Sequence, residues 1–223
     1  MPEQPVPVVT IDGPSGAGKG TVALQVAEHL GWHLLDSGAL YRLTGIAVAK
    51  AGGDFTDAQQ AAEIASNLKV RFSDGKVFLQ EEEVSLAIRT ETVGNYASKV
   101  AAIPAVRAAL LDWQRRCAQA PGLVADGRDM GTTVFPHALL KVFLTASADE
   151  RAQRRYKQLN EKGIAVNVAH LAAEILARDE RDRQRSHSPL LAADDALHID
   201  STQMTIEAVV TTVLQAVHKV LPV

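Results

Sequence analysis

The sequence predicts an α/β fold of three layers, in which helices flank a parallel sheet and a small antiparallel sheet is inserted. Three observations predict it. Short apolar runs alternate with amphipathic stretches along most of the chain, which is typical of successive βα units. A glycine-rich loop joins the first apolar run to the first amphipathic stretch. Between residues 68 and 86 the hydrophobic period changes to that of short strands.

The first unit is a strand over residues 6–12, a loop, and a helix from about residue 19 to residue 30, before Gly31. Glycines in the loop let backbone N–H groups converge on phosphate oxygens, and the helix adds its positive N-terminal end. A lysine at the end of the loop supplies a mobile charge for the β- and γ-phosphates. The sequence therefore predicts a P-loop that binds a nucleoside triphosphate through Gly13, Pro14, Ser15, Gly16, Ala17, Gly18, Lys19, Gly20 and Thr21.

This loop departs from the usual P-loop pattern at one position. Gly20 follows Lys19 where serine or threonine is usual, and the hydroxyl arrives one residue later, at Thr21. The direct magnesium ligand therefore stays open at this stage.

The second unit is a strand over residues 32–36 and a helix that extends to about residue 50. Asp36 or Ser37 is expected to cap that helix. Arg42 lies in its second turn, close to the carboxyl end of a strand, where open α/β sheets bind ligands. Beside a P-loop this position favours phosphate binding over a solvated arginine.

An inserted region is expected next, after a helix over residues 57–67. Residues 68–72 and 76–80 read as two strands joined at Asp74 and Gly75, a strong hairpin signal. We expect residues 81–83 to form a solvated turn and residues 84–86 a third strand. The insertion is placed at about residues 66–104, within a core formed by residues 1–65 and 105–223.

The middle of the chain is predicted to be helical over residues 90–118, with an interruption near Pro104. A short strand follows and ends in Asp126, which resembles the magnesium-binding carboxylate of Walker-B strands, able to act directly or through water. Arg128 and Asp129 come next, at the same sheet edge as the P-loop. We therefore expect this loop to face the nucleotide.

Two clusters of arginines follow the strand at residues 139–144. One cluster (Arg151, Arg154 and Arg155) lies on a helix that begins at Asp149, and the other is expected on one face of a helix from residue 168. The latter contains Arg178, Arg181 and Arg185. Because both flank a break at residues 163–167, we interpret residues 155–168 as a lid over phosphates. A strand over 196–200 and a helix over 205–221 complete the chain.

Composition limits the other classes of function. The 223 residues allow one α/β domain with an insertion, and 47% of them are hydrophobic. The net charge of −3 argues against nucleic-acid binding, and the single Cys117 fits a reducing compartment. With neither a signal-like start nor an apolar run of 18 residues, we expect a cytoplasmic monomer without membrane contact.

Two classes of protein are compatible with the P-loop: a small-molecule kinase and a nucleotide-hydrolysing switch. A guanine-reading Asn-Lys-x-Asp and a switch Asp-x-x-Gly do not occur in the sequence. A kinase needs a second anion site, which Arg42, Arg128 and the later arginines can provide. The arginines favour a kinase.

Four stretches together resemble the bacterial cytidylate kinases, and the similarity spans essentially the whole chain. They are residues 13–21, 36–42, 125–132 and 178–183. In that family Gly20 before Thr21 is the usual form. The resemblance implies transfer of the γ-phosphoryl group of ATP to CMP or dCMP with Mg²⁺, giving ADP and the diphosphate. Another small-molecule P-loop kinase and a hydrolysing switch are the alternatives.

The resemblance also implies a role for each candidate residue. Lys19, Arg128 and Arg154 would be catalytic, with Lys19 and Arg154 stabilising the transferring phosphoryl group. Thr21 and Asp126 would act on the metal. The remaining substrate-binding residues are Ser37; Arg42, Arg128 and Arg185 for the acceptor phosphate; Ser98, Arg107 and Asp129 for cytosine; and Arg178 and Asp182 for the ribose.

Overall fold

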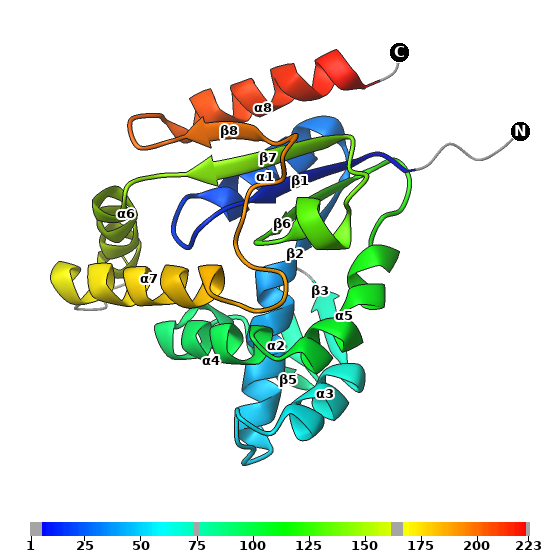
Figure 1. The fold of residues 1–223 in the computed structure, drawn as a ribbon, viewed down its shortest axis with the longest axis vertical. Coiled ribbons are helices and arrows are strands. Elements are labelled where there is room, and N and C mark those ends of the chain that lie inside the picture. The colour runs from blue at the N-terminus through cyan, green and yellow to red at the C-terminus, as the bar shows by residue number, and fades with distance from the viewer. Residues whose placement is uncertain (1–5, 74–75, 162–166, 222–223) are drawn as a thin grey trace, which may run out of the picture. The chain divides into compact units, whose positions relative to one another are not determined.

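The computed structural model describes residues 6–73, 76–161 and 167–221 and is drawn in Figure 1. Packing of the backbone divides the chain into two compact units. The first comprises Met1–Leu35 and Cys117–Val223, and the second comprises Asp36–Arg116. The second unit contains the whole of the predicted insertion and also includes a helix on either side of it.

The first unit is built on a five-stranded sheet with the order β2-β6-β1-β7-β8. The β1–β6, β1–β7 and β7–β8 pairs are parallel, which confirms the predicted α/β fold. Its elements are β1 (Val8–Asp12), α1 (Lys19–Leu30), β2 (His33–Asp36), β6 (Leu123–Gly127), η2 (Met130–Val134), β7 (Leu140–Thr145), α6 (Ala148–Asn160), α7 (Val168–Arg183), β8 (Leu197–Asp200) and α8 (Ile206–Val220).

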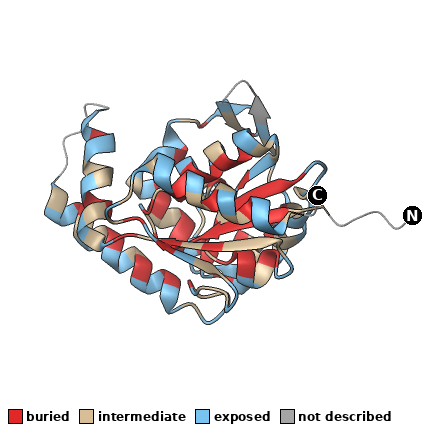
Figure 2. Cartoon of the chain, turned by 90° about the horizontal axis from the view of Figure 1, so that it is seen from above, coloured by how far each residue is buried: buried red, intermediate tan, exposed pale blue. Residues whose placement is uncertain are grey.

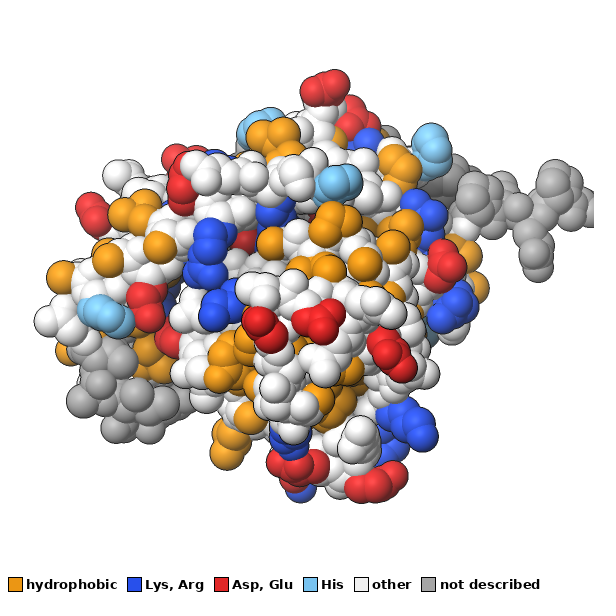
Figure 3. Space-filling model, turned by 60° about the horizontal axis from the view of Figure 1, so that its bottom comes forward, with side chains coloured by type: hydrophobic (Ala, Val, Ile, Leu, Met, Phe, Trp, Pro, Cys, Tyr) orange, Lys and Arg blue, Asp and Glu red, His pale blue; other side chains and the backbone are white. Residues whose placement is uncertain are grey.

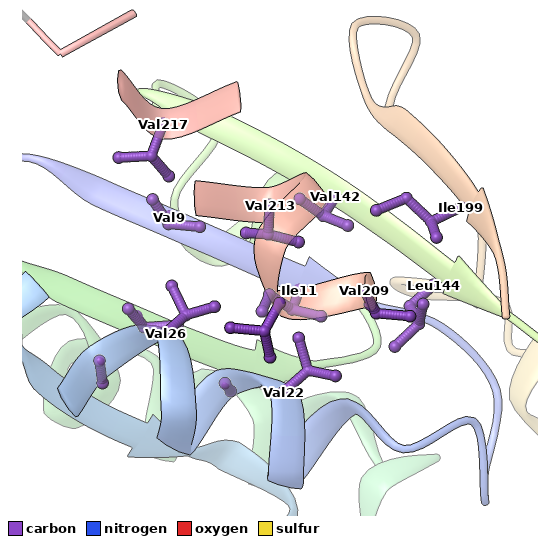
Figure 4. Packing of buried hydrophobic residues seen from close by; sticks show 14 of the residues in the cluster. Val9, Ile11, Val22, Val26, Val142, Leu144, Ile199, Val209, Val213 and Val217 are labelled. Carbon is purple, nitrogen blue, oxygen red and sulfur yellow. The ribbon is translucent and has the colours of Figure 1, made fainter. Parts of the chain in front are cut away.

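One face of this sheet is covered by α1 and α8, whose apolar side chains interdigitate with those of the strands (Figure 4). Val9 and Ile11 alternate along β1 and therefore point to the same side. Val22 of α1 and Val213 of α8 pack against them, and all four are at most 1% exposed. This core fixes β1, and with it the start of the glycine-rich loop. Helix α1 ends at Gly31 in the left-handed conformation, as predicted.

Helices α6 and α7 pack against each other beyond the carboxyl end of β7. Ser147 caps α6, and Asn167 caps α7 by accepting two backbone N–H groups. Helix α7 ends at Arg183, so Arg185 lies beyond the helix and Arg181 is exposed. The predicted single arginine face over Arg178, Arg181 and Arg185 is therefore wrong, because the helix ends two residues before Arg185. Residues 162–166 of the predicted lid lie outside the described residues.

The second unit combines helices with a three-stranded antiparallel sheet, β3-β4-β5, as predicted. Helix α2 packs on α4, and α3 packs on α5. Its elements are α2 (Ser37–Lys50), α3 (Ala58–Ser66), β3 (Val70–Ser73), β4 (Lys76–Leu79), β5 (Glu82–Glu83), η1 (Ala87–Arg89), α4 (Glu91–Ala101) and α5 (Pro104–Arg116). The helical break before Pro104 is confirmed, whereas the Asp74–Gly75 turn lies outside the described residues.

The third strand of this small sheet begins earlier than predicted. Leu79 pairs with Glu82, so the turn consists of Gln80 and Glu81, with Gln80 at a positive φ of 56°. The residues expected to form the strand follow β5. The N–H of Val84 donates to the carbonyl oxygen of Val77 on β4 at 2.8 Å, and Val84 is buried at 2% exposure. The acidic residues were placed in a turn because of their charge, but Glu82 and Glu83 are exposed strand residues.

Buried residues gather in the central strands and on the inner sides of the helices (Figure 2). On the face drawn in Figure 3, acidic and basic side chains are interspersed. Of the helices in the described part of the chain, none is both long and apolar enough to cross a membrane.

Candidate active site

The glycine-rich loop leaves β1 along a path that only glycine can follow at its first residue. Gly13 has a φ of 148°, and a Cβ atom there would lie 2.0 Å from the carbonyl oxygen of Leu144 on β7. Gly18, at φ 90°, occupies the N-cap position of α1. Because it is a glycine, no side chain at this position caps the helix. The first N–H groups of α1 therefore face the loop, which is the arrangement that binds phosphate in a P-loop.

Lys19 is held at the centre of this loop. Its side chain is 5% exposed, and Nζ donates a hydrogen bond to the carbonyl oxygen of Pro14 at 2.9 Å. Nζ also lies 3.8 Å from Oδ1 of Asp126, at the end of β6. Burial lowers the pKa of Lys19 to about 8, and the charge of Arg128 acts in the same direction, while Asp126 opposes both. A bound phosphate would relieve this electrostatic cost by adding negative charge beside the ammonium group.

Asp126 approaches the start of α1 closely because Gly20 has no side chain. A Cβ atom on Gly20 would lie 3.3 Å from Oδ2 of Asp126. Thr21, in the first turn of α1, is exposed. No group of three or more His, Cys, Asp or Glu suited to a metal ion occurs among the described residues. Mg²⁺ at nucleotide sites usually takes one or two carboxylates together with water and substrate phosphates, so a single carboxylate at this position fits it.

Arg128 forms a largely buried ionic cluster with Asp182, in the last turn of α7, and with Arg185, just beyond that helix. Nε of Arg128 donates to Oδ2 of Asp182 at 3.2 Å, and Arg185 pairs with the other oxygen of this carboxylate. Asp182 is 1% exposed. Burial raises its pKa, but the charges of Arg128, Arg185 and Arg178 outweigh that and hold the pKa of Asp182 below its usual value. Of the late arginines, Arg185 is thus paired with this buried carboxylate, whereas Arg181 is exposed.

A second buried pair holds the backbone of the P-loop. Nη1 of Arg151 lies 2.6 Å from Oδ2 of Asp179, and the two side chains are 4% and 0% exposed. Nη1 also donates to the carbonyl oxygen of Ser15 at 2.8 Å, and the N–H of Ser15 donates to Oδ1 of Asp179 at 3.2 Å. The pair therefore bonds both the backbone N–H and the backbone carbonyl of Ser15, and it connects α6 and α7 to the loop.

Arg154 reaches the far side of the same loop. Its Nη2 and Nη1 donate to the carbonyl and hydroxyl oxygens of Ser201 at 2.6 and 3.1 Å, and Nε donates to Glu150 at 2.8 Å. Nη1 lies 3.5 Å from the carbonyl oxygen of Ala17. Arg151 and Arg154 were expected on one cationic face, but Arg151 is buried in its ion pair with Asp179. Only Arg154 and Arg155 of that cluster keep partial exposure.

Of the remaining candidates, Asp129 lies in the first unit and is 1% exposed, and the other four belong to the second unit. Ser37 and Ser98 are each 3% exposed, at the start of α2 and on α4. Nη1 of Arg42 donates to the carbonyl oxygens of Ile88 and Thr90 at 2.6 and 3.1 Å. Arg107 on α5 donates to the carbonyl oxygen of Ala101 at 3.3 Å and lies over the ring of Tyr41. Tyr41 itself is buried at 7% exposure.

Four contacts of the first unit escaped prediction: those of Asp12, Arg151, Asp179 and Ser201. Asp12 ends the first strand, and both of its carboxylate oxygens accept backbone N–H groups after β6. Its position beside the glycine loop was a visible signal, but its partners are 118 and 119 residues away. Such partners become neighbours only when β1 and β6 pair in parallel.

A glycine loop with a buried lysine, a facing carboxylate and clustered arginines, all at the carboxyl edge of a parallel sheet, defines a P-loop nucleotide-binding protein of the kinase class. The family model for cytidylate kinase matches residues 9–219. The chain therefore belongs to the cytidylate kinase family.

Individual relatives agree with this assignment. The chain is 57% identical to a cytidylate kinase of Aeromonas salmonicida over 96% of this chain and 94% of that protein. It is 59% identical to a cytidylate kinase of Marinomonas sp. over 92% of each. An uncharacterized protein from Eubacterium ventriosum superposes with a TM-score of 0.53 at 12% identity, over 95% of this chain and 98% of that one, which shows likeness of fold alone.

Proposed function

We propose that this protein transfers the γ-phosphoryl group of ATP to CMP or dCMP, giving ADP and CDP or dCDP. The observation that carries the proposal is the P-loop lysine and its arginine cluster in a chain that belongs to the cytidylate kinase family. The family makes a nucleotide-hydrolysing switch the weaker alternative. Another acceptor nucleotide is the nearest competing possibility.

The donor nucleotide is assigned to the loop of residues 13–21. Backbone N–H groups at the start of α1 bind the phosphate oxygens, and Lys19 neutralises charge on the transferring group. Arg154, whose Nη1 lies 3.5 Å from the carbonyl oxygen of Ala17, is proposed to act with Lys19 on the transferring phosphoryl group. Mg²⁺, when bound, would neutralise part of the charge on the phosphates. Asp126, through water, and Thr21 are the residues proposed to hold it.

Each acceptor-binding residue is assigned to one part of the nucleotide. Arg42, Arg128 and Arg185 are proposed to bind its phosphate, because guanidinium groups match phosphate oxygens in geometry and charge. Arg178 and Asp182 are assigned to the ribose. Ser98, Arg107 and Asp129 are assigned to cytosine, where a carboxylate accepts from the amino group and an arginine donates to ring acceptors. Ser37 is counted with the acceptor-binding residues.

Closure over the phosphates is assigned to the lid of residues 155–168, which would exclude water from the transfer step. The monophosphate-binding insertion stays at about residues 66–104. The substrates are dissolved nucleotides and the single Cys117 suits a reducing compartment, so we assign the enzyme to the cytoplasm, as a monomer.

A coupled assay of ADP release across a panel of nucleoside monophosphates tests this function. Release that requires CMP or dCMP, with little response to AMP or GMP, is expected. Release at the same rate without any acceptor would favour hydrolysis. Release with a different acceptor alone would keep the kinase and replace its substrate.

A further inference from the structure

The residue that ends β1, Asp12, is buried and contacts a distant turn. It is 5% exposed. Its Oδ1 accepts the N–H of Met130 and its Oδ2 accepts the N–H of Gly131, both at 2.8 Å. Both oxygens of one carboxylate are thus committed to two consecutive amides of η2. Burial raises the pKa of Asp12 to about 7, and the two amide donors act against that rise.

Those two amides belong to the first turn of η2, where backbone N–H groups have no partner within the helix. Later residues of η2 bond normally, because Thr133 donates to the carbonyl oxygen of Asp129 at 2.9 Å. A helix is usually capped by the side chain of its own N-cap residue. In η2 that residue is Asp129, whose side chain makes no capping hydrogen bond in the described structure. Asp12, at the end of β1, supplies the cap instead.

The cap from Asp12 affects the role of the Asp129 side chain. A carboxylate that caps its own helix is folded back onto that helix and points at its amides. Because Asp12 satisfies these amides, the backbone of η2 is fixed without recruiting the Asp129 side chain. The register supports the contact, since Asp12 lies opposite Gly127, the last residue of β6. Only Arg128 and Asp129 separate Gly127 from the capped turn.

We infer that Asp12 is a positioning residue for the acceptor: by capping η2 from the end of β1, it fixes the Arg128–Asp129 turn relative to the P-loop. The inference rests on the proposed function, because that function assigns Arg128 and Asp129 to the acceptor nucleotide. Asp12 precedes Gly13 directly, so its side chain ties the acceptor turn to the strand that leads into the donor loop. It contacts neither substrate in this account.

The test is Asp12→Asn, compared with Thr10→Val as a matched control. Asparagine keeps the shape of Asp12 but can accept only one of the two amides, since its NH₂ group is a donor. Thr10 points to the same face of β1, is 0% exposed, and its hydroxyl lies 2.8 Å from where a Cβ of Gly131 would stand. That hydroxyl has no hydrogen-bond partner among the described residues, so Thr10→Val removes no cap.

We expect Asp12→Asn to raise KM for CMP about tenfold, with KM for ATP changed less than twofold. Thr10→Val should leave both constants within twofold of the parent protein. A rise in KM for CMP below fivefold, or an equal rise for both nucleotides, overturns the inference. An equal rise would mean that Asp12 supports the fold of the P-loop instead.

Hydrogen exchange of the unaltered protein gives a second test that needs neither substrate nor a folded variant. The amides of Met130 and Gly131 should be as protected as those of Val124 within β6. Rapid exchange of these two amides overturns the inference even if the variant is unstable. Should the parent protein phosphorylate a monophosphate other than CMP, the proposed substrate fails, and Asp12→Asn is then measured with that acceptor.

Discussion

The buried pair of Arg151 and Asp179 should be costly to break from one side. In Arg151→Met the methionine fills similar apolar space but leaves the Asp179 carboxylate, 0% exposed, without its counter-ion. The carbonyl oxygens of Ser15 and Ala146 also lose the guanidinium donors that lie 2.8 and 3.0 Å away in the parent protein. Removing one partner of a buried pair typically costs about 3–5 kcal/mol. For a chain of this size, that corresponds to a fall in Tm of about 6–20 °C.

Chemical denaturation of Arg151→Met, Asp179→Leu and the double variant measures this cost. Because the double variant buries no unpaired charge, it should be no less stable than Arg151→Met, and the two single losses should not add. KM for ATP should rise in all three variants, since Ser15 of the P-loop loses its anchors. A loss below 1 kcal/mol in Arg151→Met, or strict additivity in the double variant, would refute the reasoning.

Three further predictions concern the reacting groups. Lys19→Ala should lower kcat by about a hundredfold or more while KM for CMP changes little, because the ammonium stabilises the transition state; a near-normal kcat in steady-state assays would contradict that role. Asp129→Ala should lower kcat/KM for CMP about tenfold to a hundredfold and leave KM for ATP within twofold; equal losses for both nucleotides would remove Asp129 from the acceptor site. Since burial lowers the pKa of Lys19 to about 8, the free enzyme loses this positive charge as pH rises through 8, and kcat/KM for ATP should fall there. The less active Lys19→Arg variant should show no such fall, because arginine stays charged. A parent profile that stays level to pH 9 would exclude Lys19 as the titrating group.

Local signals predicted most of the elements. Gly31 ends α1, Thr90 caps α4 and Thr205 caps α8, because capping depends on residues within one turn of the helix end. The parallel sheet followed from the succession of βα units. The third strand of the small sheet was misplaced because a two-residue turn at Gln80 and Glu81 carries no glycine or asparagine to mark it.

The site was predictable in its composition but less so in its pairing. Lys19 and Asp126 follow from the motif, and the structure brings them within 3.8 Å. The sharing of Asp182 by Arg128 and Arg185 depends on how α7 ends, which a run of charges does not specify. Charge runs usually indicate solvated helix faces, yet here Asp179 and Asp182, three residues apart, are buried against Arg151 and Arg128 from other elements.

The stoichiometry of the products tests the central claim most directly. With ATP, Mg²⁺ and CMP, quantification of both products by chromatography should give one CDP for each ADP formed, and Lys19→Ala should abolish both together. ADP accompanied by inorganic phosphate without CDP would contradict the assignment of this chain as a kinase that acts on CMP.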